Sequence, residues 1–431
     1  MKKLLLILLC LPMIGFGQGW VKIYNSPECE AFKMLETTSD SGFILLGVIR
    51  GFGTPDGVTI IKTDFNGNIE WKNDYFNQFS LASIKEINSG GYIVTGSESG
   101  QPGPVFVMKL DDNGTTLWKK HPILSLPNTG VYGESIQPTN DNGFIIGCDG
   151  NNTGDTINYI FKVDSLGNLE WDKIFNDSLK SSRTRVIQLF DGNYLAYGQI
   201  SETISTPLHI DKSWLIKLDI NGNVIWEKKY SIICGDVIQC LDGNIIISGV
   251  KSFITGGGNE FGGQAALLKL DVYGDTLWYK SYDGFGLLRT AITYDSGYVS
   301  LNFIDTLNNG CKLYKMDKFG DTLFTRDLSI PIIGMGNMGP VSDIGQAKDG
   351  GYIIGTSVED SIYPSSLIAV ALLKLNNIGT STYEDEMDFL SQEEILIKIV
   401  DLLGRETKGK KNEPLFYIYD DGTVEKRITI E

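Results

Sequence analysis

Short apolar runs that follow a turn dipeptide return along the whole chain and predict β-strands. They read SGFILLG from Ser41, GGYIVTG from Gly90, NGFIIG from Asn142, DGNYLAYG from Asp191, DGNIIISG from Asp242, SGYVSL from Ser296 and GGYIIG from Gly350. A turn followed by a β-branched run is typical of a strand. The 3.6-residue spacing of an amphipathic helix is missing, so the pattern predicts an all-β protein.

A second phrase follows each of these runs. It reads KTDFNGNIEW from Lys62, KLDDNGTTLW from Lys109, KVDSLGNLEW from Lys162, KLDINGNVIW from Lys217, KLDVYGDTLW from Lys269, KMDKFGDTLF from Lys315 and a decayed KLNNIGTS from Lys374. Its Asp-x-x-Gly core suits a hairpin turn in which Gly takes the positive φ angle. Each unit therefore holds about four strands.

The spacing of these units predicts the architecture. Successive markers are 46 to 59 residues apart, at Asp64, Asp111, Asp164, Asp219, Asp271, Asp317 and Asn376. Seven four-strand units predict a seven-bladed β-propeller over residues 20–379. A Gly-rich β-solenoid is the alternative, although its repeats are usually shorter. The last unit lacks its Trp strand, whereas WVKIY at Trp20 matches WKNDY at Trp71, so we expect the N-terminal strand to close the ring.

Residues that occur in every unit are interpreted as architectural. Lys and Asp of Lys-x-Asp lie two apart, hence on one strand face, where we expect the pair to neutralise itself. The repeated Trp is expected to pack between blades rather than to stack on a ligand. The DxNGN segments at Asp64 and Asp219 are interpreted as hairpins, not calcium loops.

Residues that do not repeat are the candidates for function. In the predicted propeller the short turns share one face, and long dissimilar loops, such as 150–158 and 201–213, share the other. Divergent loops on a rigid ring are typical of a binding site; drift in unconstrained loops is the alternative. The candidate ligand-binding residues are Tyr132, His209, Phe261, Tyr363, Arg185 and Arg289.

The Asp…Gly…Trp phrase resembles the tryptophan-docking repeat of quinoprotein propellers and, more distantly, the Asp-box of sialidases. The quinoprotein family has eight blades and often a vicinal Cys pair, which this chain lacks. The sialidase likeness implies an arginine cluster, for which Arg183, Arg185 and Arg289 are candidates, but no Tyr/Glu nucleophile pair is identifiable.

We expect a binding protein for an extracellular glycan or protein, not an enzyme, with no cofactor and no metal site. Only two His residues argue against a His-based triad or metal site. The first alternative is a hydrolase or lyase of extracellular polymers, using acidic and Arg residues at the channel mouth; the second is a structural envelope scaffold. The candidates for the enzyme are Glu134, Arg185, Asp236, Arg289 and Asp343.

The N-terminus and the charge indicate the compartment and the excluded partners. Lys2 and Lys3 precede an apolar run, and small residues allow a cut after Gly17, so residues 1–17 read as a signal peptide. A lipoprotein at Cys10 is disfavoured because Leu9 is not small. The net charge of −16 argues against nucleic acid, and no other run is long enough for a membrane span. Cys234 and Cys240 are either bridged or simply buried.

The C-terminal region departs from the repeat. Residues 380–394 read as an acidic linker, and 395–431 as a small β module of three short strands. The module resembles a short form of the sorting domain of type IX secretion, without its usual PNPxxG opening. The resemblance implies that the secretion machinery is a partner and that the protein is secreted or at the cell surface, or periplasmic if the tail is not competent. The residues that carry it are Asp401, Gly404, Arg405, Tyr417, Gly422 and Lys426.

Overall fold

The structure is a computed structural model of the 431-residue chain. It describes residues 19–24, 29–50, 57–76, 79–98, 104–125, 130–152, 155–175, 180–205, 208–251, 263–303, 311–328, 342–359, 368–376, 396–400, 415–419 and 424–427.

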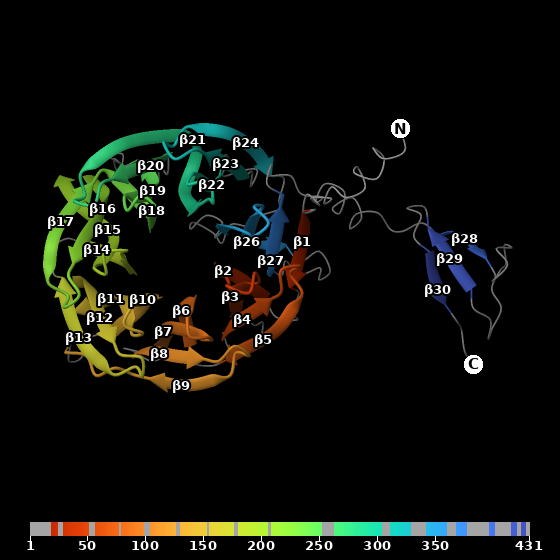
Figure 1. Ribbon diagram of the computed structural model, residues 1–431, viewed down its shortest axis with the longest axis horizontal. Coiled ribbons are helices and arrows are strands. Elements are labelled where there is room, and N and C mark those ends of the chain that lie inside the picture. Colours follow the sequence, from red (N-terminus) through yellow and green to blue (C-terminus); the bar gives the residue numbers. More distant parts are fainter. Residues whose placement is uncertain are drawn as a thin grey trace, which may run out of the picture.

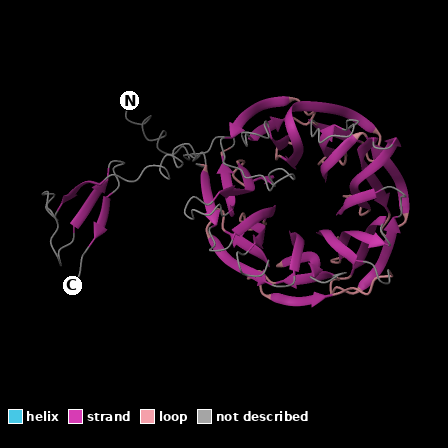
Figure 2. Ribbon diagram, turned by 180° about the vertical axis from the view of Figure 1, so that it is seen from behind, coloured by secondary structure: helices cyan, strands magenta, loops and turns pink. Residues whose placement is uncertain are grey.

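Four-stranded antiparallel sheets follow one another around a central axis, each with its first strand innermost (Figure 1). Strands carry the ring throughout, as the view from behind shows (Figure 2). The protein is therefore an all-β, seven-bladed β-propeller, as the repeat predicted.

The blades have the following strands, from the inside outwards. Blades 1 to 3 are formed by β2 (Cys29–Thr37), β3 (Phe43–Arg50), β4 (Gly57–Thr63) and β5 (Ile69–Phe76); by β6 (Phe79–Glu86), β7 (Tyr92–Glu98), β8 (Val105–Leu110) and β9 (Thr116–Lys120); and by β10 (Gly130–Pro138), β11 (Phe144–Asn152), β12 (Asp155–Val163) and β13 (Leu169–Phe175). Blades 4 and 5 are formed by β14 (Lys180–Gln188), β15 (Tyr194–Ser205), β16 (Leu208–Leu218) and β17 (Val224–Tyr230), and by β18 (Ile232–Gln239), β19 (Ile245–Lys251), β20 (Gln264–Leu270) and β21 (Thr276–Ile292). Blades 6 and 7 are formed by β21, β22 (Tyr298–Phe303), β23 (Cys311–Met316) and β24 (Thr322–Leu328), and by β25 (Ser342–Gln346), β26 (Tyr352–Glu359), β27 (Ile368–Leu375) and β1 (Trp20–Tyr24).

Three connections differ from the expectation. β21 runs without a break from the outer edge of blade 5, where it pairs with β20, to the inner edge of blade 6, where it pairs with β22. The expected loops at 150–158 and 201–213 are wrong: β11 and β12 pair out to Asn152 and Asp155, and β15 and β16 out to Ser205 and Leu208. Backbone hydrogen bonds of the ladders continue into these segments, which makes them hairpin arms rather than loops.

The N-terminal strand closes the ring, as predicted. β1 pairs antiparallel with β27, with Trp20 opposite Lys374 and Tyr24 opposite Val370. Seven hydrophobic clusters fill the blade-to-blade interfaces within the described residues; one joins Phe43 and Leu45 of blade 1 to Val370 and Leu372 of blade 7. The core is therefore a closed cycle of interfaces.

The Asp-x-x-Gly turns are hairpins, as predicted. In the first, the Asp64 carboxylate accepts hydrogen bonds from the backbone N–H groups of Asn66 and Asn68, both at 2.8 Å, and Gly67 has a φ of 74°. Asp219 makes the same contacts with Asn221 and Asn223. The side-chain oxygen that a calcium ion would need is thus used to cap the turn.

The repeated Trp packs between blades, also as predicted. The Trp71 ring of blade 1 lies on the turn Gly114 of blade 2, and its Nε1 donates to the carbonyl of Asp112 at 2.9 Å. The same ring-on-glycine contact recurs for Trp20 on Gly67, Trp118 on Gly167, Trp171 on Gly222, Trp226 on Gly274 and Trp278 on Gly320.

The expected Lys–Asp pairing within Lys-x-Asp is wrong. The buried Lys62 ammonium contacts Asp40, in the turn between β2 and β3, at 2.7 Å, and Glu70 at 2.8 Å. Asp64 lies at the strand end and faces its own turn, whereas Lys62 lies under the neighbouring turn. The same pairs are Lys162–Asp141, Lys217–Asp191, Lys269–Asp242, Lys315–Asp295 and Lys374–Asp349.

The three strands after the seventh blade form a sheet of their own. β28 (Leu396–Val400), β29 (Leu415–Tyr419) and β30 (Val424–Arg427) form a three-stranded antiparallel sheet.

Cys234 and Cys240 are free and buried, so they are not bridged; Cys148 and Cys311 are likewise free and buried.

Candidate functional site: the central channel

The inner strands of four consecutive blades carry alternating charges at one level of the channel. Arg185 of β14, Asp236 of β18, Arg289 of β21 and Asp343 of β25 pair with Tyr197, Ser248, Leu301 and Gly355. Each of these partners is the third residue after the start of its blade's second strand. Because the four residues have the same register in their blades, they lie at the same height along the axis of the ring. The order around the channel is therefore Arg, Asp, Arg, Asp.

Charged side chains from distant blades interact electrostatically inside the ring. The carboxylates of Asp343 in blade 7 and Asp236 in blade 5 help to raise the pKa of Lys85 in blade 2, against desolvation and together with its direct partner Glu36. Blades 2 and 5 lie across the ring from each other (Figure 1). The charged groups therefore converge on the axis rather than on separate blade edges.

The two arginines of the alternating set share one acceptor. Arg185 donates from Nη1 to the carbonyl of Gly235 at 3.2 Å, and Arg289 donates from Nη1 to the same oxygen at 3.1 Å. Gly235 precedes Asp236 on β18, the strand between those of the two arginines. The guanidinium groups of blades 4 and 6 therefore meet over blade 5.

Hydrogen bonds from neighbouring groups of the protein fix the two carboxylates of the set. Asp236 accepts from the Tyr197 hydroxyl at 3.2 Å and from the backbone N–H of Val237 at 3.0 Å. Asp343 accepts from the N–H of Ile344 at 3.0 Å and from the N–H of Leu35 in blade 1 at 3.4 Å. Desolvation raises the pKa of Asp343 despite the opposing charge of Arg289.

A third arginine stands beside the pair. Arg183 has a φ of 62°, unusual for a side-chain-bearing residue, within an irregular stretch of β14. The carboxylate of Asp149 holds this stretch by accepting from the N–H groups of Arg183 at 2.6 Å and Thr184 at 2.8 Å. Desolvation and the charges of Arg185 and Arg289 lower the pKa of Arg183.

Two further ionisable groups lie next to the arginines and are both shifted toward their neutral forms. Desolvation, followed by the charge of Asp149, raises the pKa of Glu134 on β10. Desolvation lowers the pKa of Lys33 on β2, whose ammonium donates to the carbonyl of Leu81 at 2.6 Å. Shifts of this kind gather at functional sites more often than elsewhere.

The sequence-predicted residues fall into three groups. The structure brings together on the inner strands the five enzyme candidates, which include the ligand-binding candidates Arg185 and Arg289. Tyr132 lies on β10 with 41% of its surface exposed, and His209 lies on β16, opposite Thr203. Phe261 and Tyr363 lie outside the described residues, as does most of the loop face.

Lys33 and Lys85 are not among the residues that the sequence predicted for the site. A usable signal was present for the alternating set, because each of its members stands nine residues before the first residue of its blade's second strand. Aligning the repeats on that residue would have placed Arg185, Asp236, Arg289 and Asp343 in one column.

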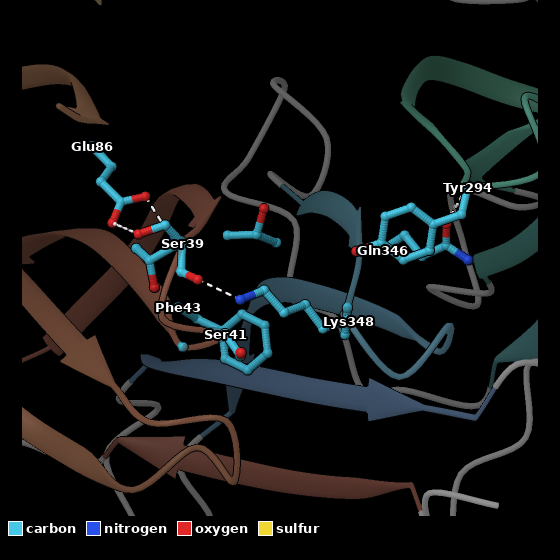
Figure 3. A pocket seen from close by; sticks show the side chains of 11 residues that line it. Ser39, Ser41, Phe43, Glu86, Tyr294, Gln346 and Lys348 are labelled. Carbon is cyan, nitrogen blue, oxygen red and sulfur yellow. Dashed lines mark hydrogen bonds between the residues drawn. The ribbon is translucent and has the colours of Figure 1, made fainter. Parts of the chain in front are cut away.

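A pocket on the short-turn face is the second candidate (Figure 3). It has a volume of 280 Å³, and Ser39, Glu86, Tyr294, Gln346 and Lys348 line it. Glu86 accepts from the Ser39 N–H and hydroxyl, both at 2.7 Å, Lys348 donates to the Ser39 carbonyl, and Gln346 accepts from the Tyr294 N–H at 2.6 Å. Because these polar groups already bind one another, the pocket serves mainly to join neighbouring blades.

The described part of the chain contains no group of three or more His, Cys, Asp and Glu side chains placed to hold a metal ion. Within the same ranges, no helix has the length and apolar character that crossing a membrane requires.

Comparison with known proteins identifies the fold. No protein-family model matches the chain, and no curated protein matches it. Among solved structures, the polysaccharide lyase Uly1 is similar with a TM-score of 0.51 at 8% identity, over 82% of this chain and 91% of the lyase. The Dos1 propeller has a TM-score of 0.48 at 12% identity, over 84% of this chain and 97% of its own. A protein of unknown function from Dyadobacter fermentans has a TM-score of 0.49 at 7% identity, over 83% of this chain and 97% of its own. At 8% identity the likeness to the lyase shows the fold alone, and one fold supports many functions.

Proposed function

We propose that this protein is an exported binding propeller that holds an extracellular glycan or protein ligand in its central channel. The observation that carries the proposal is the convergence of Arg185, Asp236, Arg289 and Asp343 at one level of the channel. Ionisable groups are costly to desolvate, and a ring needs only apolar or small side chains at its axis. Function is the physical reason to keep charges there.

The proposal includes export. Its support is the charged and apolar pattern of residues 1–17 and the sorting-type motif of the tail. Two of the six tail residues, Tyr417 and Lys426, lie in β29 and β30; Asp401, Gly404, Arg405 and Gly422 lie outside the described residues.

Capture of extracellular polysaccharides and proteins, with analysis of the eluate for cleavage products, tests the binding function. Capture without product supports it. Tyr132→Ala should weaken capture, whereas Tyr279→Ala should not, although the two side chains are 41% and 40% exposed. Tyr279 lies on the outer part of β21, away from the channel. Equal loss in both variants, or no capture of any probe, would refute the proposal.

A hydrolase or lyase of such polymers is the second candidate. The observation in its favour is that Glu134 and Lys33 are shifted toward neutrality beside the arginines, as a proton donor and a proton acceptor would be. Release of new reducing ends from a polysaccharide, abolished by Glu134→Gln, would establish this alternative. Binding with no such release excludes it for the polymers used.

A further inference from the structure

The pair formed by Arg185 and Arg289 has hydrogen-bonding capacity that the described fold does not use. A guanidinium carries five N–H donors, and with the part of the chain that the structure describes each of these arginines makes one hydrogen bond, to the carbonyl of Gly235. Within the described residues, neither forms an ion pair with a carboxylate. Both side chains are half-buried and stand on the inner strands β14 and β21, at the axis of the ring.

The shared acceptor fixes how close the two groups lie. Both Nη1 atoms approach one oxygen, at 3.2 and 3.1 Å, so their separation cannot exceed the sum of these distances. Two cations at this range repel each other, and an anion between or above them would relieve the repulsion. The charge of Arg183, which already responds to both arginines, adds to the field.

The negative groups at the same level balance part of this charge: desolvation lowers the pKa of Arg185 but the charge of Asp236 helps to raise it, and desolvation raises the pKa of Asp343 while the charge of Arg289 lowers it. Within the described residues, however, neither carboxylate forms a hydrogen bond with either guanidinium. Asp236 is engaged by Tyr197 and Val237, and Asp343 by Ile344. The planar fork of an arginine matches the two oxygens of a carboxylate. The site therefore offers donors for a ligand carboxylate, with fixed acceptors on either side.

The neighbouring residues of β10 indicate which kind of carboxylate fits. Tyr132 is 41% exposed, and two positions on, Glu134 stands at a β-bulge of β10, where the charges of Lys33, Arg185 and Arg183 act on its carboxylate. An aromatic ring can cover the apolar face of a sugar, and a carboxylate can accept hydrogen bonds from its hydroxyls.

We propose that Arg185 and Arg289 bind the carboxylate of a uronic-acid residue in an acidic polysaccharide, with Glu134 accepting from its hydroxyls. This inference rests on the proposed binding function and names its ligand class.

The test measures binding of oligogalacturonate by calorimetry and compares it with the methyl ester of the same oligosaccharide. The ester keeps the sugar and loses the charge. Wild-type protein should bind the acid about tenfold or more tightly than the ester, since a charge-assisted pair is worth at least that factor. Arg185→Gln and Arg289→Gln should each reduce this preference by a similar factor. Arg326→Gln, on the outer strand β24, is the matched control and should leave it unchanged.

Arg185→Lys guards against a folding defect, because it keeps a charge and a donor for Gly235 but loses the fork. It should melt like the wild type and still lose most of the preference for the acid. Equal binding of acid and ester, an effect of Arg326→Gln as large as that of Arg185→Gln, or equal binding of an acidic peptide would overturn the inference. If neutral polymers are captured by all variants alike, the binding function stands and this ligand class falls.

Discussion

The ring of Trp20 lies so close to Gly67 that a β-carbon on this glycine would stand 2.6 Å from the Trp20 Cη2 atom. Trp20 belongs to the first described strand of the chain and to the outer edge of blade 7, whereas Gly67 belongs to the turn of blade 1. The contact repeats across the closure of the ring the packing that Trp71 and Gly114 make between blades 1 and 2. The closing interface is therefore built like the others.

This contact predicts a difference between two alanine substitutions. Gly67 and Gly192 both have positive φ angles, of 74° and 83°, but nothing lies within 4 Å of a β-carbon on Gly192. Gly192→Ala should cost about 1 kcal/mol of stability from backbone strain alone. Gly67→Ala should cost about 1 to 3 kcal/mol more, because it also displaces Trp20. Urea unfolding measures both; equal costs would show that the closing contact contributes nothing.

Deleting residues 18–26 should lower the melting temperature markedly. The deletion removes β1 and leaves β27 as an open edge, and it uncovers Gly67 at the same time. Thermal unfolding followed by circular dichroism is the measurement. A melting temperature equal to that of the full ring would contradict closure by β1.

The Lys–Asp pairs predict a specific loss of stability in acid. Desolvation opposes the charge of Asp295, yet hydrogen bonds from Lys315 and Thr293 lower its pKa to about 2. Because the folded pKa lies below that of the unfolded chain, near 3.8, the contribution is complete above about pH 4 and is lost as the pH falls to about 2. The difference in unfolding free energy between wild type and Asp295→Asn should shrink over that interval. A difference independent of pH would contradict the pairing.

The four buried cysteines of the described ring should not react with thiol reagents in the native protein. Desolvation raises the pKa of Cys234 and of Cys311 to about 12, and it also raises those of Cys148 and Cys240. The reactive thiolate is therefore scarce at mildly alkaline pH. Ellman's reagent should detect these four only after unfolding in denaturant without reductant. Two missing thiols in that unfolded sample would indicate a bridge between Cys234 and Cys240.

Removing residues 380–431 should separate folding from export. The seven blades end at β27, so the truncated protein should melt like the full chain. In a host with the type IX machinery it should accumulate in the periplasm, because the sorting-type tail is gone. Delivery of the truncated form to the surface at full yield would refute the proposed role of the tail, and a lowered melting temperature would show that it supports the ring.

The repeat alone determined most of the architecture. Turn residues, β-branched runs and the Asp-x-x-Gly hairpins act over a few residues, so they can be recognised without knowing what lies across the fold. The repeat number and the match between Trp20 and Trp71 were enough to predict seven blades and their closure. The recurrence of Trp also predicted its packing role, because a residue present in nearly every unit is expected to support the fold that the units have in common.

Only the tertiary structure decided which charges meet. Lys62 is two residues from Asp64 in the sequence, but its ammonium binds Asp40, which lies on the far side of strand β3 in the chain. The contact forms because the end of β4 and the turn between β2 and β3 lie on the same face of the ring. The sequence named Arg185 and Arg289 as candidates, yet they lie about a hundred positions apart and share the Gly235 carbonyl only because the ring brings the inner strands of blades 4, 5 and 6 to one axis. Contacts of this kind depend on closure and register, which act over the whole chain and leave no local pattern.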